Sequence, residues 1–593
     1  MFSYFTIFKM IFCMNTEVRN IPEAFLRAAR LNSMKTFEIF KKKDVWKVRN
    51  FKESTNIILS VASALIDSGV KNGDKVAILS QTRSEWLLSD LAIQFAGATT
   101  VPIYPGIQPE IISYILEHSE SKILFVERRG LLRNVKIPKN VKNIIVYDSQ
   151  ETGEGYTSFE KFQNQSHEKI DIESIKPDDL ATIVYTSGTT GYPKGVMLTH
   201  KNILSMVSSV SDVIHPRDDD IIFAWLPFAH IFGRLIIFYA VRNAVTVAYA
   251  ENIAKIVDNL KEVKPTLFPS VPRIYEKAYE KIKQSSSVGI KKNIFDLAEK
   301  VAERYAEYIR DKLAPPLYFS LIYKIMDLLV YSKIRQAFGG RIRLCISGGA
   351  AIPTHIAKFF TGAGIKLLEG YGLTETSSVV TVNLENKFKF GSIGLPIPQV
   401  YVKISEDGEL LIKSDSVMKG YYKLEEETKN AFTEDGWLKT GDIVEMDDEG
   451  FLFFKGRKKN IIVTSFGKNI APEPIELEIQ KDPLVGNVAV FGDEKPYLVA
   501  LVSLNEEEVS RIAKEKGLNQ DLKQIAKSDW IRQRIQQIID EVNSKRPSYE
   551  KIHRFEIVED VWTPESGELT PTLKTKRYFI YKKYKDLIEK MYS

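Results

Sequence analysis

The sequence predicts an α/β protein with a large N-terminal domain and a smaller α+β C-terminal domain. The N-terminal domain is expected to hold parallel α/β subdomains and a small β-barrel-like subdomain. Three observations lead to this prediction. At 593 residues the chain exceeds the roughly 250–300 residues of a single core. Helix-like and strand-like segments alternate from about Asn50, and short strands separated by turns replace them from about Val400.

The alternating segments predict a parallel sheet with helices on both faces. Each segment pairs a helical pattern with an apolar strand, or is a short apolar strand alone. They lie at residues 63–80, 84–104, 122–127, 143–148 and 181–188.

A mostly helical insertion is expected at about residues 275–340, which are rich in Lys, Tyr and Leu. Within it, residues 317–330 are apolar but are interrupted by Lys324 and Asp327. Such a stretch is too short and too charged for a membrane span, so it predicts a buried helix.

The β-rich subdomain is expected at about residues 395–456, where Asp-Gly and Glu-Gly pairs punctuate short strands as in an antiparallel barrel or sheet. The segment GRKKN then opens a region with helices and strands of its own. We therefore place a domain boundary between 1–456 and 457–593. The C-terminal elements are predicted at residues 472–480, 487–492, 497–504 and, as a long helix, 520–542.

The composition is ordinary for a globular protein, with 44% hydrophobic and 27% charged residues and a net charge of +6. No basic stripe interleaved with aromatic residues occurs, so nucleic acid is not expected as a partner. The mild positive charge fits anionic small molecules, and it leaves a transient membrane-surface contact open. The two cysteines, Cys13 and Cys345, have no metal-ligand spacing, which favours a cytoplasmic protein without disulfides or zinc.

The first 13 residues are apolar but about half the length of a bilayer span, and they lack a signal-cleavage site. They read as a weak peripheral anchor or as a consequence of start-codon choice. We favour the second reading, because Met14 opens a more typical polar amino terminus.

The loop YTSGTTGYPKGV, residues 185–196, predicts a polyphosphate site. Its hydroxyls, free backbone N–H groups and one ammonium suit phosphate oxygens, and its glycines permit tight turns and a close approach. The alternative is a Walker P-loop, but Pro193 stands where that motif needs Gly, and Gly195 where it needs Ser or Thr. A P-loop ATPase is therefore disfavoured.

Further motifs follow this loop in a characteristic order: SGGAAIP, YGLTET, TGD, GRKKN and GELTPTLKTKR. With them, the chain resembles the adenylate-forming (AMP-binding) superfamily from about residue 50 almost to its end. Within that superfamily it is most similar to the long-chain fatty acyl-CoA synthetases. The features that favour this branch are LPFAHIFGR, VPRIYEKAYEKI with the helical insertion, SGGAAIP and GELTPTLKTKR.

The resemblance implies a nucleotide site. Tyr371 is expected to stack on adenine, Asp442 to bind the ribose hydroxyls and Arg457 to contact the nucleotide. Glu375 and Thr186 are expected to hold Mg²⁺, since a carboxylate beside a phosphate loop requires a cation between them. The remaining nucleotide-binding residues are expected to be Ser187, Gly188, Thr189, Thr190, Gly191, Lys194, Gly349, Ala350, Gly370, Gly372 and Thr374.

The resemblance also implies acyl and thiol sites. Trp225, His230 and Gly233 are expected along the acyl tunnel, with His230 at the reaction centre. Gly467 is expected to line a thiol tunnel, although a simple turn explains it equally well.

The same motifs imply a hinged C-terminal domain. Lys459 stands at the expected hinge, and Lys574 matches the mobile catalytic lysine of that domain. Lys194 and Glu375 are its expected catalytic partners. Lys576 and Arg577 are close enough to Lys574 to leave the register of this match open.

These implications predict an acid–thiol ligase that takes a fatty acid, ATP with Mg²⁺ and CoA. A carboxylate would attack the α-phosphorus of ATP and release pyrophosphate, and a thiol would then displace AMP. A ligase that loads acyl carrier protein, a ligase for another acid and a catalytically silent nucleotide-binding module remain alternatives. The oligomeric state, including a homodimer, is left open.

Overall fold

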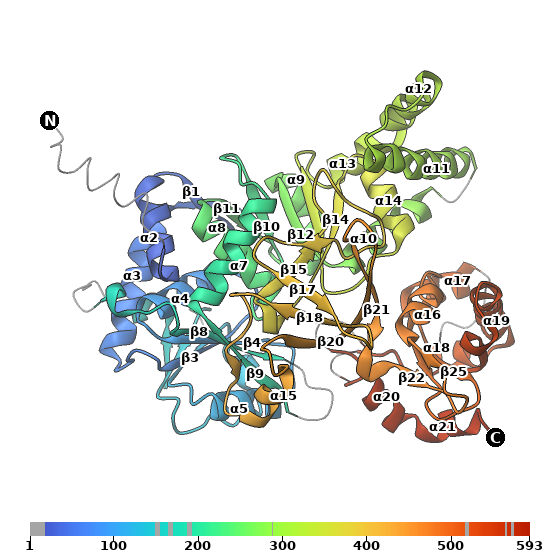
Figure 1. The fold of residues 1–593 in the computed structure, drawn as a ribbon. Coiled ribbons are helices and arrows are strands. Elements are labelled where there is room, and N and C mark those ends of the chain that lie inside the picture. Colours follow the sequence, from blue (N-terminus) through green and yellow to red (C-terminus); the bar gives the residue numbers. More distant parts are fainter. Residues whose placement is uncertain are drawn as a thin grey trace.

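The computed structural model describes residues 18–148, 155–163, 170–186, 192–286, 289–515, 517, 521–563, 566–570 and 575–593 (Figure 1). The apolar start at residues 1–13 lies outside these ranges. No helix among the described residues is both long enough and apolar enough to cross a membrane.

The first large sheet has eight strands and is mixed. Its middle strands are parallel, as predicted, but the strand before the phosphate loop is followed by an antiparallel partner and not by a helix. The prediction of a parallel sheet is therefore wrong at this edge, where the glycine-rich loop joins two arms of a hairpin. The strand order is β19 (Gly420–Tyr421), β9 (Lys194–Thr199), β8 (Leu180–Thr186), β4 (Thr99–Ile103), β3 (Lys75–Leu79), β5 (Ile123–Val126), β6 (Asn143–Val146) and β7 (Tyr156–Ser158).

The second large sheet has nine strands, parallel in the middle and antiparallel at both ends. Its strand order is β16 (Leu395–Pro396), β15 (Ser378–Val382), β14 (Leu367–Leu373), β13 (Leu344–Ser347), β12 (Leu267–Ser270), β10 (Ile221–Ala224), β11 (Thr246–Tyr249), β1 (Thr36–Lys42) and β2 (Val45–Asn50).

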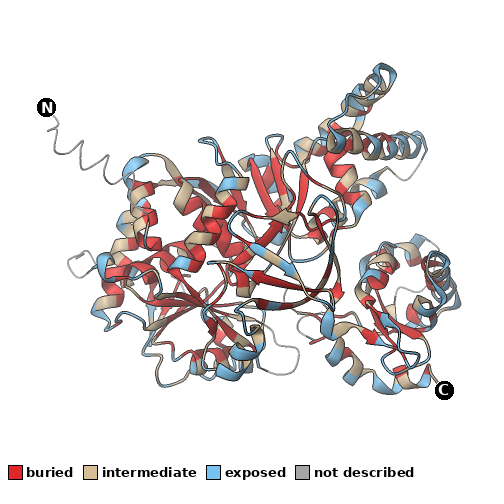
Figure 2. Ribbon diagram, in the orientation of Figure 1, coloured by how far each residue is buried: buried red, intermediate tan, exposed pale blue. Residues whose placement is uncertain are grey.

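A set of helices packs with the two large sheets into one hydrophobic core (Figures 1 and 2). Capping boxes begin two of these helices, at Asn50 with Glu53 and at Thr199 with Asn202. The central strands β3, β4 and β5 are almost wholly buried, as expected for strands covered on both faces. The helices are α2 (Ile21–Leu31), α3 (Phe51–Asp67), α4 (Ser84–Phe95), α7 (His200–Val213) and α8 (Ile231–Asn243).

The β-rich segment forms a four-stranded antiparallel sheet, the second of the two predicted forms. Its order is β17 (Tyr401–Ile404), β18 (Glu409–Lys413), β20 (Leu438–Met446) and β21 (Leu452–Arg457).

The C-terminal part has its own hydrophobic core around a three-stranded sheet. The helix predicted at 520–542 is divided into α18 (Leu522–Ala526) and α19 (Asp529–Ser544), because Lys527 and Ser528 leave the helix and Ser528 becomes the N-cap of α19. The other elements are the hairpin β22 (Ile462–Val463) and β23 (Asn469–Ile470), α16 (Pro472–Ile479), β24 (Val485–Phe491), β25 (Leu498–Leu504), α17 (Glu506–Glu515), β26 (Ile552–Val558), α20 (Arg577–Lys583) and α21 (Lys585–Lys590).

The insertion between β12 and β13 is helical and projects from the body of the molecule (Figure 1). The prediction that residues 317–330 form a buried helix is wrong: the helix forms, but Leu317 is 91% and Leu328 75% exposed. Only one face of this helix packs against other parts of the fold. The elements are α10 (Pro272–Ser285), α11 (Ile290–Asp311), α12 (Leu317–Met326), a π-helical turn (Asp327–Tyr331) and α13 (Ser332–Ala337), and α14 (Thr354–Gly362) follows β13.

Candidate active site

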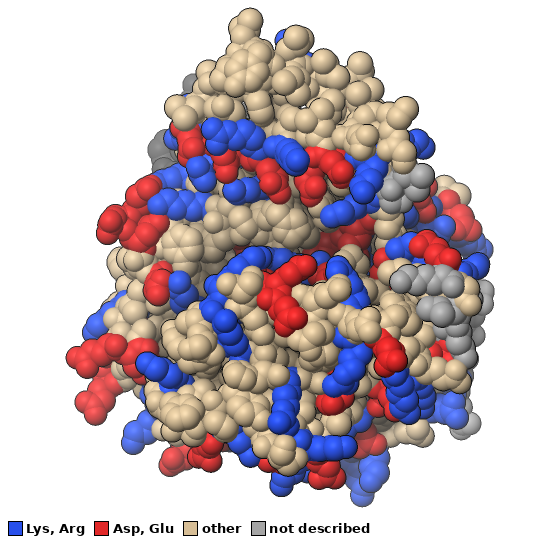
Figure 3. All heavy atoms as spheres, turned by 90° about the vertical axis from the view of Figure 1, so that its right-hand side faces the viewer, with Lys and Arg blue, Asp and Glu red and all other residues tan. Residues whose placement is uncertain are grey.

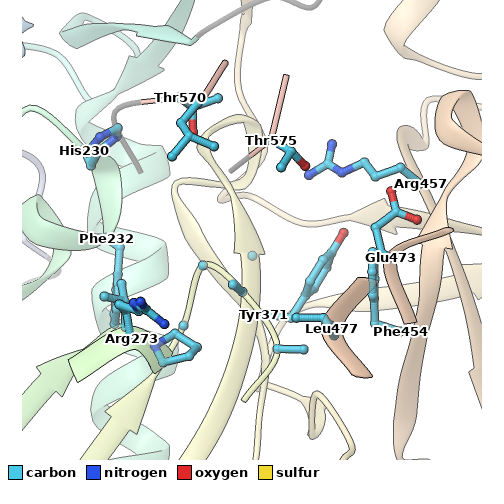
Figure 4. Close-up of a pocket in the computed structure, with 18 of the residues that line it drawn as sticks. His230, Phe232, Arg273, Tyr371, Phe454, Arg457, Glu473, Leu477, Thr570 and Thr575 are labelled. Carbon is cyan, nitrogen blue, oxygen red and sulfur yellow. The ribbon is translucent and has the colours of Figure 1, made fainter. Parts of the chain in front are cut away.

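A cavity of about 2850 Å³ opens at the carboxyl ends of the parallel strands (Figure 4). Tyr104, Trp225, Val271 and Gly348 line it, and each follows directly after one of these strands. In open α/β sheets this edge is where ligands bind, because loops and free strand ends converge there. The C-terminal part forms the remaining wall, so the cavity lies between the two parts of the chain.

Asp442, Tyr371 and Arg457 form one connected group in this cavity. The Tyr371 hydroxyl donates to Asp442 Oδ2 at 2.6 Å, and Arg457 Nε pairs with Asp442 Oδ1 at 2.8 Å. Asp442 and Arg457 are direct partners in the β20–β21 register, which explains why TGD and GRKKN act together. Burial, followed by the Asp442 carboxylate, raises the pKa of Tyr371 well above its ordinary value.

Lys194, Tyr421 and Glu375 form a second group, near the base of the phosphate loop. The Lys194 ammonium lies 5.2 Å from the Tyr421 ring centroid, and the Tyr421 hydroxyl donates to Glu375 Oε1 at 2.9 Å. Thr186 pairs with Lys194 in the β8–β9 register. Thr186, Thr374 and the members of this group line the cavity. Ser187, Gly188, Thr189, Thr190 and Gly191 lie outside the described residues.

The predicted glycines fall into two kinds. Gly349 lines the cavity with Ala350 and has φ +84°, a conformation that favours glycine. Gly372 is required by packing, because a Cβ there would lie 1.4 Å from the Ser378 carbonyl oxygen of the neighbouring strand. Gly370 also lies on β14 and lines the cavity.

Trp225, His230 and Gly233 lie together at the start of α8 and line the cavity. Trp225 Nε1 donates to the Pro269 carbonyl oxygen at 3.0 Å, which orients the indole. His230 is the N-cap residue of α8, and its ring centroid is 5.8 Å from that of Tyr104. Aliphatic side chains from α7, α8 and the second sheet also line the cavity, and we call this part of its wall the aliphatic branch: Val210, Val213, Ile222, Leu235, Ile236 and Leu344.

The C-terminal part reaches the cavity through residues on both sides of Lys574, which itself lies outside the described residues. Thr570 and Thr575 line the cavity, and a β-bridge pairs Leu569 with Thr575. Figure 4 shows both threonines at the top of the cavity, between His230 and Arg457. The two described residues that flank 571–574 in the sequence therefore both lie at this site.

The neighbouring cations of the same segment also line the cavity, but Arg577 is held by an ion pair and Lys576 is partly buried. Arg577 makes two contacts with the Glu476 carboxylate, at 2.7 and 3.0 Å, and donates to the Val490 carbonyl oxygen. Burial lowers the pKa of Lys576.

Lys459 and Gly467, the expected hinge and thiol-tunnel residues, lie in different surroundings. Lys459 lies in a 3₁₀ turn after β21 and lines the cavity, and burial followed by the charge of Arg457 lowers its pKa. Gly467 does not line the cavity. It lies in the β22–β23 turn at φ +72°, its N–H donates to the Thr464 carbonyl oxygen, and a Cβ there would contact nothing. In this arrangement the turn explanation accounts for Gly467.

Sequence reasoning missed Tyr421 and Glu369. Tyr421 is brought to Lys194 and Glu375 by the pairing of β19 with β9, which joins segments more than 200 residues apart, so no local pattern reveals it. Glu369 precedes Gly370 on β14 and accepts a hydrogen bond from the Ile352 N–H at 3.1 Å. Burial raises its pKa to about 8, and an acidic residue within the apolar run LLEG was the available signal.

The donor set fits a magnesium ion that is held mainly by phosphate oxygens. Glu375 offers a carboxylate oxygen beside the phosphate-loop strands, and Thr186 offers a hydroxyl. Among the described residues no group of three or more His, Cys, Asp or Glu side chains could hold a metal. Mg²⁺ commonly takes one or two protein ligands and completes its shell with substrate phosphates and water, which agrees with this arrangement.

Two family models match the chain. The model described as AMP-binding enzyme matches residues 27–422, and the one described as AMP-binding enzyme C-terminal domain matches residues 459–593.

Curated relatives match over most of their length. The long-chain-fatty-acid–CoA ligase FadD15 of Mycobacterium bovis is 35% identical, with 93% of each chain covered. Long chain acyl-CoA synthetase 4 of Arabidopsis thaliana is 30% identical, with 93% of this chain and 87% of that protein covered.

Solved structures share the fold. The anthranilate CoA ligase AuaEII in complex with anthranoyl-AMP superposes with a TM-score of 0.72 at 21% identity, covering 96% of this chain and 98% of that one. O-succinylbenzoate CoA synthetase from Bacillus subtilis, in complex with ATP and magnesium, gives a TM-score of 0.68 at 21% identity over 94% of this chain and 98% of that one.

Proposed function

The chain belongs to the AMP-binding enzyme family, and we propose that it is an ATP-dependent long-chain fatty acid–CoA ligase. The observation that carries this proposal is one continuous cavity that joins three features. These are the Asp442 group, the Lys194–Tyr421–Glu375 group, and the aliphatic branch. The names of the curated relatives support the same substrate class.

In the first step the fatty acid carboxylate attacks the α-phosphorus of ATP, and the α–β phosphoanhydride bond breaks to release pyrophosphate. Asp442 accepts hydrogen bonds from the ribose hydroxyls, and Tyr371 presents its ring to the adenine. Lys194 neutralises charge on the leaving phosphates, and Lys574 does so at the attacked phosphoryl group. A positioned cation of this kind lowers a barrier by about 3–4 kcal/mol.

Glu375 and Thr186 would hold Mg²⁺ among the phosphates. When bound, the ion would neutralise charge that accumulates on the phosphate oxygens. Tyr421 orients the Glu375 carboxylate through its hydroxyl and contacts the Lys194 ammonium through its ring, so it is a positioning residue for both.

In the second step the thiol sulfur of CoA attacks the carbonyl carbon of the acyl-adenylate, and AMP leaves with the bonding electrons. The thiol proton passes to solvent or to the departing phosphate. Because Thr570 and Thr575 line the cavity, we infer that Lys574 and an incoming thiol would compete for one space. We infer that residues 457–593 rotate about Lys459 between the steps, and that this motion brings Gly467 toward the thiol path.

The aliphatic branch supports a long acyl chain as the substrate. Its side chains come from α7, α8 and the second sheet, and none of the six named above is charged. Long acids partition into membranes, so we propose a cytoplasmic enzyme that meets its substrate at the membrane surface.

The proposal is tested by acid-dependent pyrophosphate release over a panel of acids from short to long, with CoA present. We expect release that rises with chain length and ends in a CoA thioester and AMP. Purified acyl carrier protein, supplied in place of CoA, tests the acceptor. Formation of ADP and phosphate, or release that no acid stimulates, would refute the proposal.

A further inference from the structure

The helical insertion carries a continuous apolar surface that the fold leaves uncovered. Seven of the 23 exposed large hydrophobic side chains in the described part of the chain fall within the 17 residues 313–329. We call them the ridge: Leu313, Leu317, Tyr318, Leu321, Ile325, Leu328 and Leu329. Several are spaced by three or four residues, so they share one face of α12 and the π-helical turn.

Hydrogen bonds and ring stacking on the opposite face fix the orientation of the ridge. The Tyr323 hydroxyl donates to the Gly362 carbonyl oxygen at 2.9 Å, and its ring stacks on Tyr305 with centroids 3.7 Å apart. The Tyr331 hydroxyl donates to the Ala298 carbonyl oxygen at 2.6 Å. The outward direction of the ridge is therefore built into the packing of the insertion.

The ridge stands at the tip of a projection. In Figure 1, α12 is the labelled helix furthest from the body, and in Figure 3 the same end of the molecule is a mass of uncharged atoms above a belt of Lys, Arg, Asp and Glu. A projecting tip of this kind can enter a yielding surface such as a lipid bilayer without a preformed groove to receive it.

The unpaired charges beside the ridge are all positive. Lys312, Lys324 and Lys333 are exposed, and none of them has an ion-pair partner among the described residues. The carboxylate within this segment, Asp327, is neutralised by Arg335 at 2.6 Å. A partner for this surface therefore combines apolar material with negative charge.

We propose that the ridge docks on the surface of a lipid bilayer that contains anionic lipids. The apolar side chains would enter the zone between headgroups and acyl chains, Tyr318 would lie at the boundary, and the lysines would reach lipid phosphates. A symmetric contact with a second copy of this chain fits less well, because it places the same lysines opposite one another. The inference builds on the proposed function, since the acid substrate dissolves in the same bilayer.

The test is flotation of the full chain with vesicles of phosphatidylcholine and phosphatidylglycerol in equal parts, without ATP or CoA. The double variant Leu321→Gln/Leu328→Gln should lower the partition coefficient at least about tenfold. Lys324→Gln should lower it by about fivefold on these vesicles and should have little effect on pure phosphatidylcholine. Added salt should weaken binding of the unmodified chain.

The matched control is Met34→Gln/Val48→Gln, which also replaces two apolar side chains by glutamine, at positions outside the ridge that are 73% and 67% exposed. Equal loss of binding in both double variants, or undiminished binding of the ridge variant, would overturn the proposal. So would sedimentation equilibrium that shows a dimer which only the ridge variant dissociates. Because vesicle binding needs no catalysis, its failure would leave the ligase proposal standing.

Discussion

Two apolar helices of this protein, α8 and α12, differ strongly in how far they are buried. Ten of the 13 residues of α8 are buried, whereas one of the ten residues of α12 is buried. Their sequences, IFGRLIIFYAVRN and LYFSLIYKIM, are similarly apolar, and each carries at least one basic residue. Apolar content therefore predicts a helix, while the elements that surround it decide whether both faces are covered.

One basic residue from each helix makes the same point. Arg234 of α8 is fully buried, and its guanidinium contacts both oxygens of Asp90, at 2.6 and 2.8 Å, as well as the Thr182 hydroxyl. Lys324 of α12 is exposed beside the ridge. Burial on all sides thus requires a partner for the charge, whereas an outward face leaves the lysine free to meet an external surface.

The largest effect is expected from Arg234→Met on α8. It leaves the Asp90 carboxylate buried without a counter-charge and should cost about 3–5 kcal/mol of stability, measured by urea unfolding. The control Arg310→Met removes a partly exposed pair with Asp311 and should cost less than about 1 kcal/mol. Equal urea midpoints for the two variants would contradict the expectation that the buried ion pair matters more for stability than the exposed one.

Burial of the Glu369 carboxyl group should also make the free energy of unfolding depend on pH. The pKa of Glu369 is about 8 in the folded chain and about 4.5 when unfolded, so the unfolded state loses this proton first. Folding stability therefore falls as pH rises from about 4.5 to 8. Glu369→Gln keeps an acceptor for the Ile352 N–H and should remove this loss, with a gain that grows toward pH 8. If Glu369→Gln changed the melting temperature by the same amount at pH 5 and at pH 8, this expectation would be contradicted.

A smaller effect, seen in specificity, is expected from Ile236→Phe on the cavity side of α8. The larger ring should obstruct the aliphatic branch. The ratio of kcat/KM for a long acid to that for a short acid should fall about tenfold or more. Steady-state assays with both acids measure this ratio, and the short acid serves as the internal control for folding. An unchanged ratio would place the acyl chain elsewhere.

The smallest effect on stability is expected from the ridge. Leu321→Gln/Leu328→Gln should shift the free energy of unfolding by no more than about 0.5 kcal/mol, because both side chains already contact water. The same chemical change at Leu235, which is 6% exposed on α8, should cost several times more. A large loss of unfolding free energy in the ridge variant would mean that another part of the protein covers the ridge.

Much of the fold followed from local patterns. The alternating segments, the insertion and the β-rich sheet all appear because periodicity and turn residues report on nearby backbone. The hairpin after β8 and the exposure of α12 did not follow, since each depends on which distant element packs alongside.

The candidate site likewise contains residues that could be linked from sequence and residues that could not. Asp442 and Arg457 could be linked from sequence because they occupy facing positions of one hairpin. Tyr421 could not, because β19 pairs with β9 across more than 200 residues. Gly467 was ambiguous from sequence, and the structure gives it a turn.

We propose that the site is complete only when the C-terminal part supplies Lys574. The measurement that tests it separates the two half-reactions for Lys574→Ala, with Lys576→Ala as the matched control. We predict that Lys574→Ala slows adenylate formation on the order of 100–1,000-fold but spares thioester formation from supplied acyl-adenylate. Lys576→Ala should affect neither half-reaction strongly. Adenylate formation that survives intact in Lys574→Ala would contradict the account.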